Sequence, residues 1–449
     1  MNRIGLLQKF AYSGGDLGFN LLFGSIGAFL LYFYTDVFGI TAAQAGLVLL
    51  AARLWDAVWD IALGALVDRT RTRFGQMRPY LLFGAPLLGL AAVACFTVPP
   101  LSGSAKLVYA FIAYTVLMSA YSLVNIPYGA LPTLMSSDSQ QRTRLASWRM
   151  FFGFAGTMLM GAGTQPLVGA LGHGDAAAGF QRVMMLYAAL LTVLIWICAA
   201  ACREHVATGS IVQATPLKDL TTLLRTRAWI CLALSNLIVF SLLLLPLANA
   251  VYYMTYVVGQ PAMIPFYMMA SGVAMMMAAA ISGALTQRFC KRTVWRASTM
   301  LAVLGFLGVW MIDQHDLRQV FAMVLIANVC AGISVPINFA MASDVADAIE
   351  AKHGSRLPGL VFSTLSFTGK AGLGLSGAIA GFVLAASDYV PNGAQPASAL
   401  QGILLCMSLI PAGGCLLLVA VQWAYPYGQR EILNIGETLA KARAGLVTT

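Results

Sequence analysis

Long apolar runs separated by short polar stretches recur along the whole chain. Each run holds roughly twenty residues, which is the length that a helix needs to cross a hydrocarbon core of about 30 Å. The pattern therefore predicts twelve membrane-spanning helices, at residues 14–37, 42–67, 79–100, 106–133, 144–171, 181–202, 227–257, 262–287, 294–313, 317–348, 358–386 and 399–426.

The basic residues between these runs fall almost entirely in alternate loops. Of the Lys and Arg residues in the loops or at the ends of the runs, 21 lie on one side of the membrane, and 3 (Lys106, Arg182 and Arg318) lie on the other. Basic loops stay in the cytoplasm, so we expect both termini to be cytoplasmic. The net charge of +10 then marks a membrane face and gives no reason to invoke nucleic acid as a partner.

Composition excludes a soluble protein. Of the 449 residues, 59% are hydrophobic and only 10% are charged, and the mean hydropathy is +0.79. A soluble domain has about a quarter of its residues charged, so lipid must cover the apolar exterior here. The fold class expected is all-α integral membrane. The eight cysteines lie apart without a CxxC pair, and we interpret them as buried helix residues.

The longest loop between runs divides six spans from six. This division predicts an N-terminal six-helix bundle at 1–202, a cytoplasmic connecting loop at 203–226, a C-terminal six-helix bundle at 227–426 and a cytoplasmic tail at 427–449. Six plus six helices with such a connector is a major-facilitator-type arrangement.

A few charged residues fall inside the predicted spans, where charge is costly and usually functional. Arg53, Asp56 and Asp60 are spaced i, i+3 and i+7, so a helix would place them on one face. Two neighbouring carboxylates in low dielectric need a cation, and a proton, Na⁺, Arg or Lys would serve. The spacing predicts a coupling site, and a static ion-pair network with Arg53, Arg149 or Lys370 is the alternative.

Several motifs resemble the glycoside–pentoside–hexuronide:cation symporter family. They cover most of the chain and are Tyr12–Asn20, Tyr34–Gly39, Ala52–Asp60, Asp68–Pro79, Tyr121–Leu131, Trp148-Arg149, Ala342–Asp347, Phe362-Ser363 and Lys370. The resemblance implies a cation-coupled sugar carrier of the major facilitator superfamily in a bacterial inner membrane, with a small sugar-like solute, membrane lipid and no obligate protein partner.

The resemblance also implies roles for individual residues. The cation-coupling residues are Asp56, Asp60, Ser122 and Lys370. The solute-binding residues are Asn20, Asp16, Tyr121, Asn125, Tyr128, Arg149 and Ser366. Apart from the resemblance, we interpret a further set of charged residues as a gate, with plain topogenic charge as the alternative for the cluster from Asp68 to Arg78 and Arg142 and Arg144: Arg53, Asp68, Arg73, Arg78, Arg142, Arg144 and Asp344.

The chain departs at several positions from the melibiose permease, a member of the family that it resembles, and these departures narrow the solute and the coupling ion that we expect. Asn20 and Asn125 stand where that permease has carboxylates, and an amide accepts an acidic sugar that a carboxylate would repel. Trp59 stands where an Asn oxygen would assist Na⁺, which favours H⁺ as the coupling ion. We therefore expect H⁺-coupled symport of a glycoside, pentoside or uronate, with no cofactor and no metal site unless Na⁺ binds at Asp56 and Asp60.

Two other functions are weighed against this one. A carrier of the same fold could move an amphiphile such as a lysolipid, which the Met-rich second half would suit. An intramembrane prenyltransferase needs two aspartate-rich motifs, whereas the chain has one DxxxD, so we do not expect an enzyme.

Overall fold

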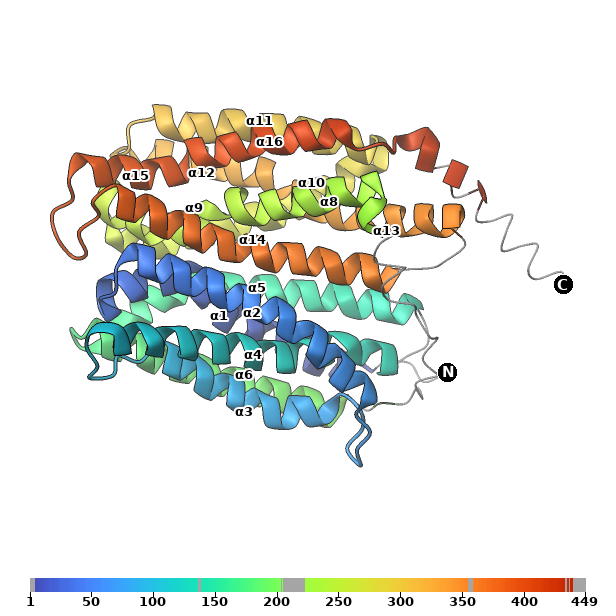
Figure 1. Cartoon of the computed structure of the whole chain (residues 1–449), viewed down its shortest axis with the longest axis horizontal. Coiled ribbons are helices and arrows are strands. Elements are labelled where there is room, and N and C mark those ends of the chain that lie inside the picture. The colour runs from blue at the N-terminus through green and yellow to red at the C-terminus, as the bar shows by residue number, and fades with distance from the viewer. Residues whose placement is uncertain are drawn as a thin grey trace. The chain divides into compact units, whose positions relative to one another are not determined.

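A computed structural model describes residues 5–135, 139–202, 204, 223–353, 358–432, 434–435 and 437–438. These residues form helices joined by short loops, as expected (Figure 1). In chain order the helices are α1 (Leu6–Tyr32), η1 (Phe33–Phe38), α2 (Ala42–Arg69), α3 (Arg78–Cys95), α4 (Gly103–Met135), α5 (Ser139–Gly172), α6 (Ala176–Ala201), α8 (Arg227–Ile238), η2 (Val239–Leu243), α9 (Leu245–Tyr252), η3 (Tyr253–Val257), η4 (Pro261–Met263), α10 (Ile264–Arg288), α11 (Lys291–Met311), α12 (Leu317–Gly332), α13 (Ser334–His353), α14 (Pro358–Ala386), α15 (Ala397–Met407) and α16 (Leu409–Ala424).

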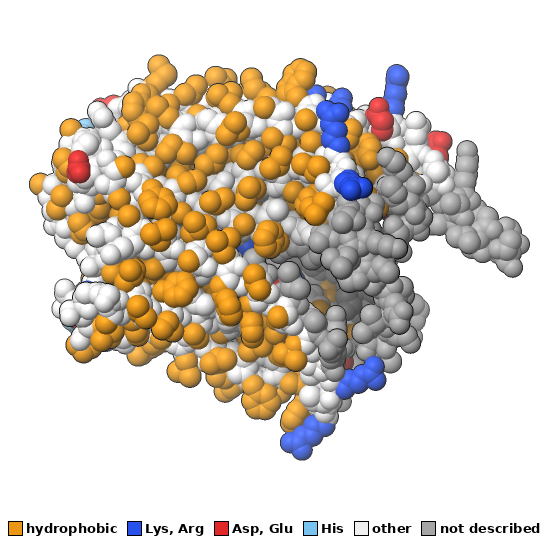
Figure 2. All heavy atoms as spheres, in the orientation of Figure 1, with side chains coloured by type: hydrophobic (Ala, Val, Ile, Leu, Met, Phe, Trp, Pro, Cys, Tyr) orange, Lys and Arg blue, Asp and Glu red, His pale blue; other side chains and the backbone are white. Residues whose placement is uncertain are grey.

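Ten stretches of the described chain are long and apolar enough to cross a membrane. Helices α2 and α5, of 28 and 34 residues, are long enough but are not among the ten. Helix α2 carries Arg53, Asp56 and Asp60 within its predicted span, and these charges lower its mean hydropathy. Large apolar side chains are exposed on many helices, as Figure 2 shows, and lipid is the solvent that such a surface requires.

Several predicted spans are not continuous α-helices, and the span at 14–37, for example, ends in the π-helical η1. The span predicted at 227–257 contains two π-helical segments, η2 and η3. The span at 317–348 changes helix at Ile333, three residues before Pro336, and the span at 399–426 breaks at Ser408, three residues before Pro411. Proline lacks an N–H and clashes with the preceding turn, which accounts for breaks at these positions.

Contacts divide the chain into two compact units, which we describe separately. The first unit consists of Met1–Ser210, Leu247–Gly272 and Gly377–Ile403. Within it α1 packs on α5 and α6, α3 packs on α4 and α6, and α2 packs on α4. Close helix contact depends on small residues: a Cβ on Gly156 would lie 2.6 Å from the Leu17 carbonyl oxygen, and one on Gly18 would lie 2.9 Å from the Leu191 side chain.

The second unit consists of Ile211–Pro246, Val273–Ser376 and Leu404–Thr449. Helix α11 packs on α12 and α16, and α8 packs on α13 and α16. The fully buried Trp295 lies in the apolar core of this unit. A Cβ on Gly305 would lie 2.8 Å from the Ala327 Cα, so α11 and α12 touch through their backbones. The six-plus-six division at residues 203–226 is a statement about chain topology and stays a prediction, and most of that connecting loop lies outside the described residues.

Candidate solute and cation site

An ion pair joins α1 to α5 inside the first unit. Nε of Arg149 donates to Oδ2 of Asp16, and the two side chains are 32% and 11% exposed. The pair is thus mostly withdrawn from water, where an unpaired charge would be costly. Asn20, one turn after Asp16, donates from Nδ2 to the Asp16 carbonyl oxygen at 2.8 Å. Its Oδ1 accepts from the Thr157 hydroxyl of α5 at 3.2 Å. Three residues predicted to bind solute therefore lie together.

Two stacked tyrosines border this ion pair. The rings of Tyr12 and Tyr128 lie 4.6 Å apart at 15°, and each hydroxyl donates to the backbone carbonyl of the other residue. The Arg149 guanidinium lies 5.1 Å from the centre of the Tyr128 ring. The Tyr128 ring of α4 packs against Gly15 of α1, where a Cβ would lie 2.6 Å from the ring, so the ring fits only because Gly15 has no side chain. The aromatic face holds the guanidinium in a fixed position.

Further along α4, Tyr121 lies against the aromatic rings of α1. It stacks on Phe23 at 4.5 Å and meets Phe19 edge to face at 5.6 Å. The guanidinium of Arg53 on α2, a residue that is 4% exposed, lies 4.8 Å from the centre of the same Phe23 ring. Asn125 is half-buried on α4. The structure thus puts Arg53 among aromatic rings in the interior of the unit.

The predicted cation residues of α2 contact α4. Asp56 is fully buried, and its Oδ1 accepts a hydrogen bond of 2.7 Å from the Ser122 hydroxyl. Two indole N–H groups of α2 also reach α4: Trp55 donates to the Ser119 hydroxyl at 3.0 Å, and Trp59 donates to the Ser119 carbonyl oxygen at 3.1 Å. Because α2 is one continuous helix, Asp60 lies one turn beyond Asp56 on the same face, half-buried.

The remaining predicted cation and solute residues lie in the second unit. Lys370 is half-buried and Ser366 is exposed, both on α14. Their grouping with the residues of the first unit stays a prediction. Asp344 of α13 is paired: Nζ of Lys291 lies 2.8 Å from both of its carboxylate oxygens. Burial raises the cost of the Asp344 charge, and the ammonium offsets it.

The gate residues predicted near Arg78 are held in several ways. Arg78 donates from Nε to the Ala199 carbonyl oxygen at 2.6 Å, and the guanidinium of Arg73 lies 4.9 Å from the Phe74 ring centre. The side chains of Asp68, Arg142 and Arg144 lie outside the described residues.

Two carboxylates with extensive contacts are absent from the predicted sites. Glu204 accepts from the backbone N–H groups of Gln76, Met77 and Arg78 at 2.7, 2.9 and 3.1 Å, and so caps the N-terminus of α3. Asp36, at the end of η1, accepts several hydrogen bonds described below. Asp36 lies in the Tyr34–Gly39 motif and at the edge of a predicted span, and these were the available signals for it. Nothing local marks Glu204.

The family described as MFS/sugar transport protein matches residues 11–429. The chain belongs to this family. The sequence motifs had pointed to glycoside–cation symporters, and relatives of that kind align over nearly the whole chain, which confirms the resemblance. A membrane transporter of this family is not an enzyme.

Three similar proteins illustrate the match. The putative glycoside/cation symporter YagG of Escherichia coli K12 is 31% identical, over 99% of this chain and 97% of its own length. The isoprimeverose transporter of Lactiplantibacillus pentosus is 32% identical, over 92% of this chain and 87% of its own. The glucuronide carrier protein homolog of Escherichia coli K12 is 30% identical, over 94% and 93%.

Solved structures show the same major-facilitator fold at low identity. A D-xylose–proton symporter matches with a TM-score of 0.69 and 12% identity, over 93% of this chain and 97% of that one. The nucleoside transporter NupG matches with a TM-score of 0.63 and 15% identity, over 94% and 99%. At this identity the similarity establishes the fold, and the transported solute has to be argued separately.

Proposed function

We propose that the protein is a secondary active symporter that moves a sugar, glycoside or uronate together with H⁺ by alternating access. The observation that carries the proposal is the fully buried Asp56 carboxylate, held by the hydroxyl of Ser122 on a neighbouring helix. A buried ionisable group on a membrane helix commonly marks an ion pathway or a proton relay. The names of the relatives, which include glycoside and isoprimeverose carriers, support a sugar-like solute.

The choice of H⁺ over Na⁺ rests on the surroundings of Asp56. The side chain of Trp59 has no oxygen that could bind Na⁺. Its indole N–H donates to the Ser119 carbonyl oxygen of α4, so that oxygen is already hydrogen-bonded. A metal ion needs several oxygen ligands, whereas a proton needs one carboxylate oxygen. The buried pair of Ser122 and Asp56 therefore fits a proton better than Na⁺.

Arg149 supports the solute side of the proposal. The guanidinium is 32% exposed, and Asp16 uses its Nε, so N–H groups remain that can donate to sugar hydroxyls. The tyrosine rings next to it, Tyr12 and Tyr128, are fully buried and stacked on each other, so they support the guanidinium from behind. Asp16 balances the charge of Arg149, so the site accepts neutral glycosides, and a uronate would have to compete with Asp16 for the guanidinium.

The membrane arrangement proposed is twelve spans, with α2 and α5 added to the ten most apolar stretches, and with both termini in the cytoplasm. The two six-helix bundles, 1–202 and 227–426, would rock about the solute site. The carrier with bound solute would change the side to which it opens only when the cation is also bound. A relative is named an inner membrane symporter, which supports location in a bacterial plasma membrane.

Uptake into proteoliposomes tests the proposal. The purified protein is given radiolabelled glycosides, pentoses and uronates under separate H⁺ and Na⁺ gradients. Accumulation driven by the H⁺ gradient and lost in Asp56→Asn is expected, with Ser119→Ala as a control on the same α2–α4 contact. Accumulation driven by Na⁺ without a proton requirement would refute the coupling ion. Uptake blocked by a lysolipid and unaffected by sugars would favour the amphiphile carrier instead.

A further inference from the structure

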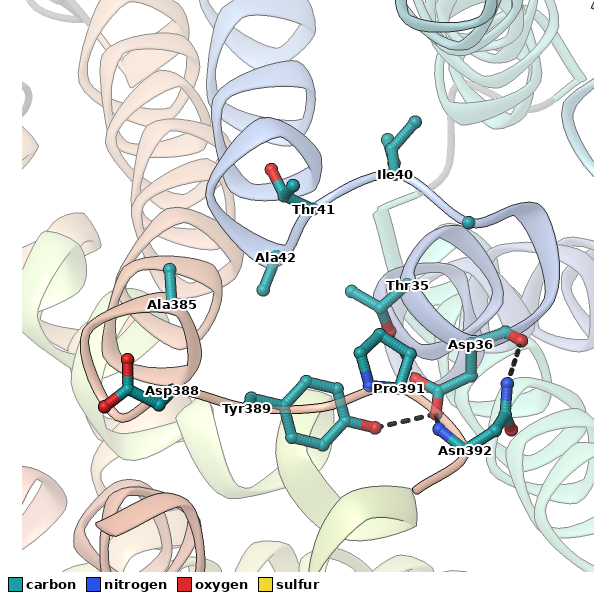
Figure 3. Close-up of a pocket in the computed structure, with 11 residues that line it drawn as sticks. Thr35, Asp36, Ile40, Thr41, Ala42, Ala385, Asp388, Tyr389, Pro391 and Asn392 are labelled. Carbon is teal, nitrogen blue, oxygen red and sulfur yellow. Dashed lines mark hydrogen bonds between the residues drawn. The ribbon is translucent and has the colours of Figure 1, made fainter. Parts of the chain in front are cut away.

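The carboxylate of Asp36 joins segments of the first unit that lie far apart in the sequence. Its Oδ1 accepts from the Tyr256 hydroxyl at 2.8 Å, from the Tyr389 hydroxyl at 2.7 Å and from the Asn392 backbone N–H at 3.3 Å. Asp36 lies in η1, which follows α1, and Tyr256 lies in η3. Tyr389 and Asn392 lie in the loop after α14, next to Asp36 (Figure 3). One oxygen atom therefore collects donors from two distant segments.

The other polar atoms of this region complete the cluster. Oδ2 of Asp36 accepts from the Thr35 hydroxyl at 2.5 Å, and the Asp36 backbone carbonyl accepts from Nδ2 of Asn392 at 2.5 Å. The Thr35 hydroxyl also lies 2.7 Å from the hydroxyl of Tyr252 at the end of α9. We call Thr35, Asp36, Tyr256, Tyr389 and Asn392 the Asp36 cluster.

Neutral donors hold this charge. The ion pairs described above involve Asp16 and Asp344, whereas the donors to Asp36 are hydroxyl and amide hydrogens. Asp36 is 9% exposed, and hydrogen bonds to an ionised acceptor are stronger than those between neutral groups. Burial raises the pKa of Tyr389, and the charge of Asp36 raises it further, so the phenol stays protonated and keeps donating.

The backbone turns tightly around the cluster. Gly39 ends η1 with φ +81°, and Asn392 has φ +54°, a conformation that Asn adopts more readily than most residues. Beside these turns lies a cavity of about 650 Å³, whose lining includes Asp36, Thr41 and Tyr389 (Figure 3). Space for solvent thus lies next to the cluster, and water can replace its hydrogen bonds when the segments separate.

Helices α2 and α14 touch through their backbones at the same end of the unit. A Cβ on Gly381 would lie 2.3 Å from the Ala42 carbonyl oxygen and 3.0 Å from the Gly46 Cα. A Cβ on Gly46 would in turn lie 3.1 Å from the Ala378 Cα. This contact brings the start of the loop that carries Tyr389 and Asn392 against the start of α2.

We propose that Asp36 is a positioning residue that latches this end of the unit closed. The hydrogen bonds of Asp36 join η1, which follows α1, to η3 and to the loop at 386–396. The inference rests on the proposed alternating-access function. In that function a solute enters or leaves at this end only after the hydrogen bonds to Asp36 have broken. The loop charges predict that this end faces away from the cytoplasm.

Hydrogen exchange of the full-length protein in nanodiscs tests the latch without any solute. Asp36→Asn keeps the size of the side chain but replaces one oxygen by a donor that faces other donors. Tyr389→Phe removes one donor and keeps the ring. Both changes are expected to raise exchange of backbone amides at 253–260 and 386–396 by about tenfold, the change that about 1.4 kcal/mol produces. Tyr109→Phe is the matched control, since that hydroxyl donates to the Ala94 carbonyl oxygen.

Gly381→Ala supplies an independent variant. Its Cβ would force α14 away from Ala42, so it should raise exchange in the same two segments although it leaves every donor of Asp36 in place. Gly27→Ala, on α1, is its control because a Cβ there meets nothing within 4 Å. All variants are compared at equal monodispersity, so unfolding is separated from local opening.

Uptake kinetics distinguish a latch from a merely structural contact. A weaker latch populates the open state, so the apparent KM for solute supplied at this end falls by about threefold to tenfold. The kcat falls as well, because return through the closed state becomes slower. Unchanged exchange in both segments, or a KM that rises, would overturn the latch. Altered exchange with no sugar uptake in any variant would instead leave the latch standing and reject the proposed solute.

Discussion

The hydroxyl of Ser122 donates to the Asp56 carboxylate across the α2–α4 contact at 2.7 Å. The pair stabilises the ionised carboxylate in a place where it is fully buried. Removing one partner of such a buried hydrogen bond costs about 1–3 kcal/mol.

A variant of this pair distinguishes H⁺ coupling from Na⁺ coupling. In Ser122→Ala the ionised carboxylate is less stable, so a proton binds more readily and the proton concentration for half-maximal uptake falls by about tenfold. If Na⁺ were the coupling ion, the variant would lose an oxygen ligand, and the Na⁺ concentration required would rise. Uptake titrations against each ion measure this difference. Ser122→Thr keeps the hydroxyl and should resemble the parent protein.

Substitutions of Asp16 and Arg149 should have effects on uptake that do not add, because the two residues pair with each other. Asp16→Asn and Arg149→Gln are each expected to reduce kcat/KM for the solute, because each leaves a mostly buried charge unpaired. The double variant should lose much less than the two losses added together, with a coupling free energy of about 1–3 kcal/mol. A double-mutant cycle on uptake measures this coupling. Additive losses would show that the two residues act separately.

Glu204 and Gly75 make a prediction about stability. Gly75 has φ +110°, and a Cβ there would lie 2.6 Å from Oε1 of Glu204. Gly174 also has a positive φ, +95°, but nothing lies within 4 Å of a Cβ there, so it lacks the contact. Gly75→Ala should therefore lower the thermal unfolding midpoint more than Gly174→Ala does, since backbone strain alone costs about 1–3 kcal/mol.

The Glu204 contact can be isolated in a second background. When Gly75→Ala is made in a Glu204→Ala protein, its cost should fall to that of Gly174→Ala. Equal costs in both backgrounds would mean that the Glu204 side chain moves aside without penalty.

Lys291 and Asp344 should stabilise the second unit modestly. The ammonium contacts both carboxylate oxygens at 2.8 Å, but Lys291 is 32% exposed, so solvent screens part of the attraction. Lys291→Met is expected to lower the unfolding free energy by about 1 kcal/mol, measured by thermal unfolding in detergent. The reversed pair, Lys291→Asp with Asp344→Lys, should recover part of the loss, whereas a further drop would argue against direct pairing.

Local sequence pattern was sufficient for the membrane helices and for the face that Asp56 and Asp60 share. Apolar length and helical period are properties of neighbouring residues, so they can be read without knowing the fold. The breaks near Pro336 and Pro411 were less evident, because a proline in a membrane helix bends, interrupts or leaves it according to what packs around it.

Only the tertiary structure decided which side chains meet. The Asp16–Arg149 contact spans 133 residues of sequence, Ser122–Asp56 spans 66, and Asn392–Asp36 spans 356. No local period relates such positions. The family resemblance grouped Ser122 with Asp56 and Asp16 with Arg149, but the atoms that meet could be named only from the structure. Asp36 and Glu204 were missed for the same reason: their importance lies in donors that reach them from distant segments, and helix packing alone brings those donors into place.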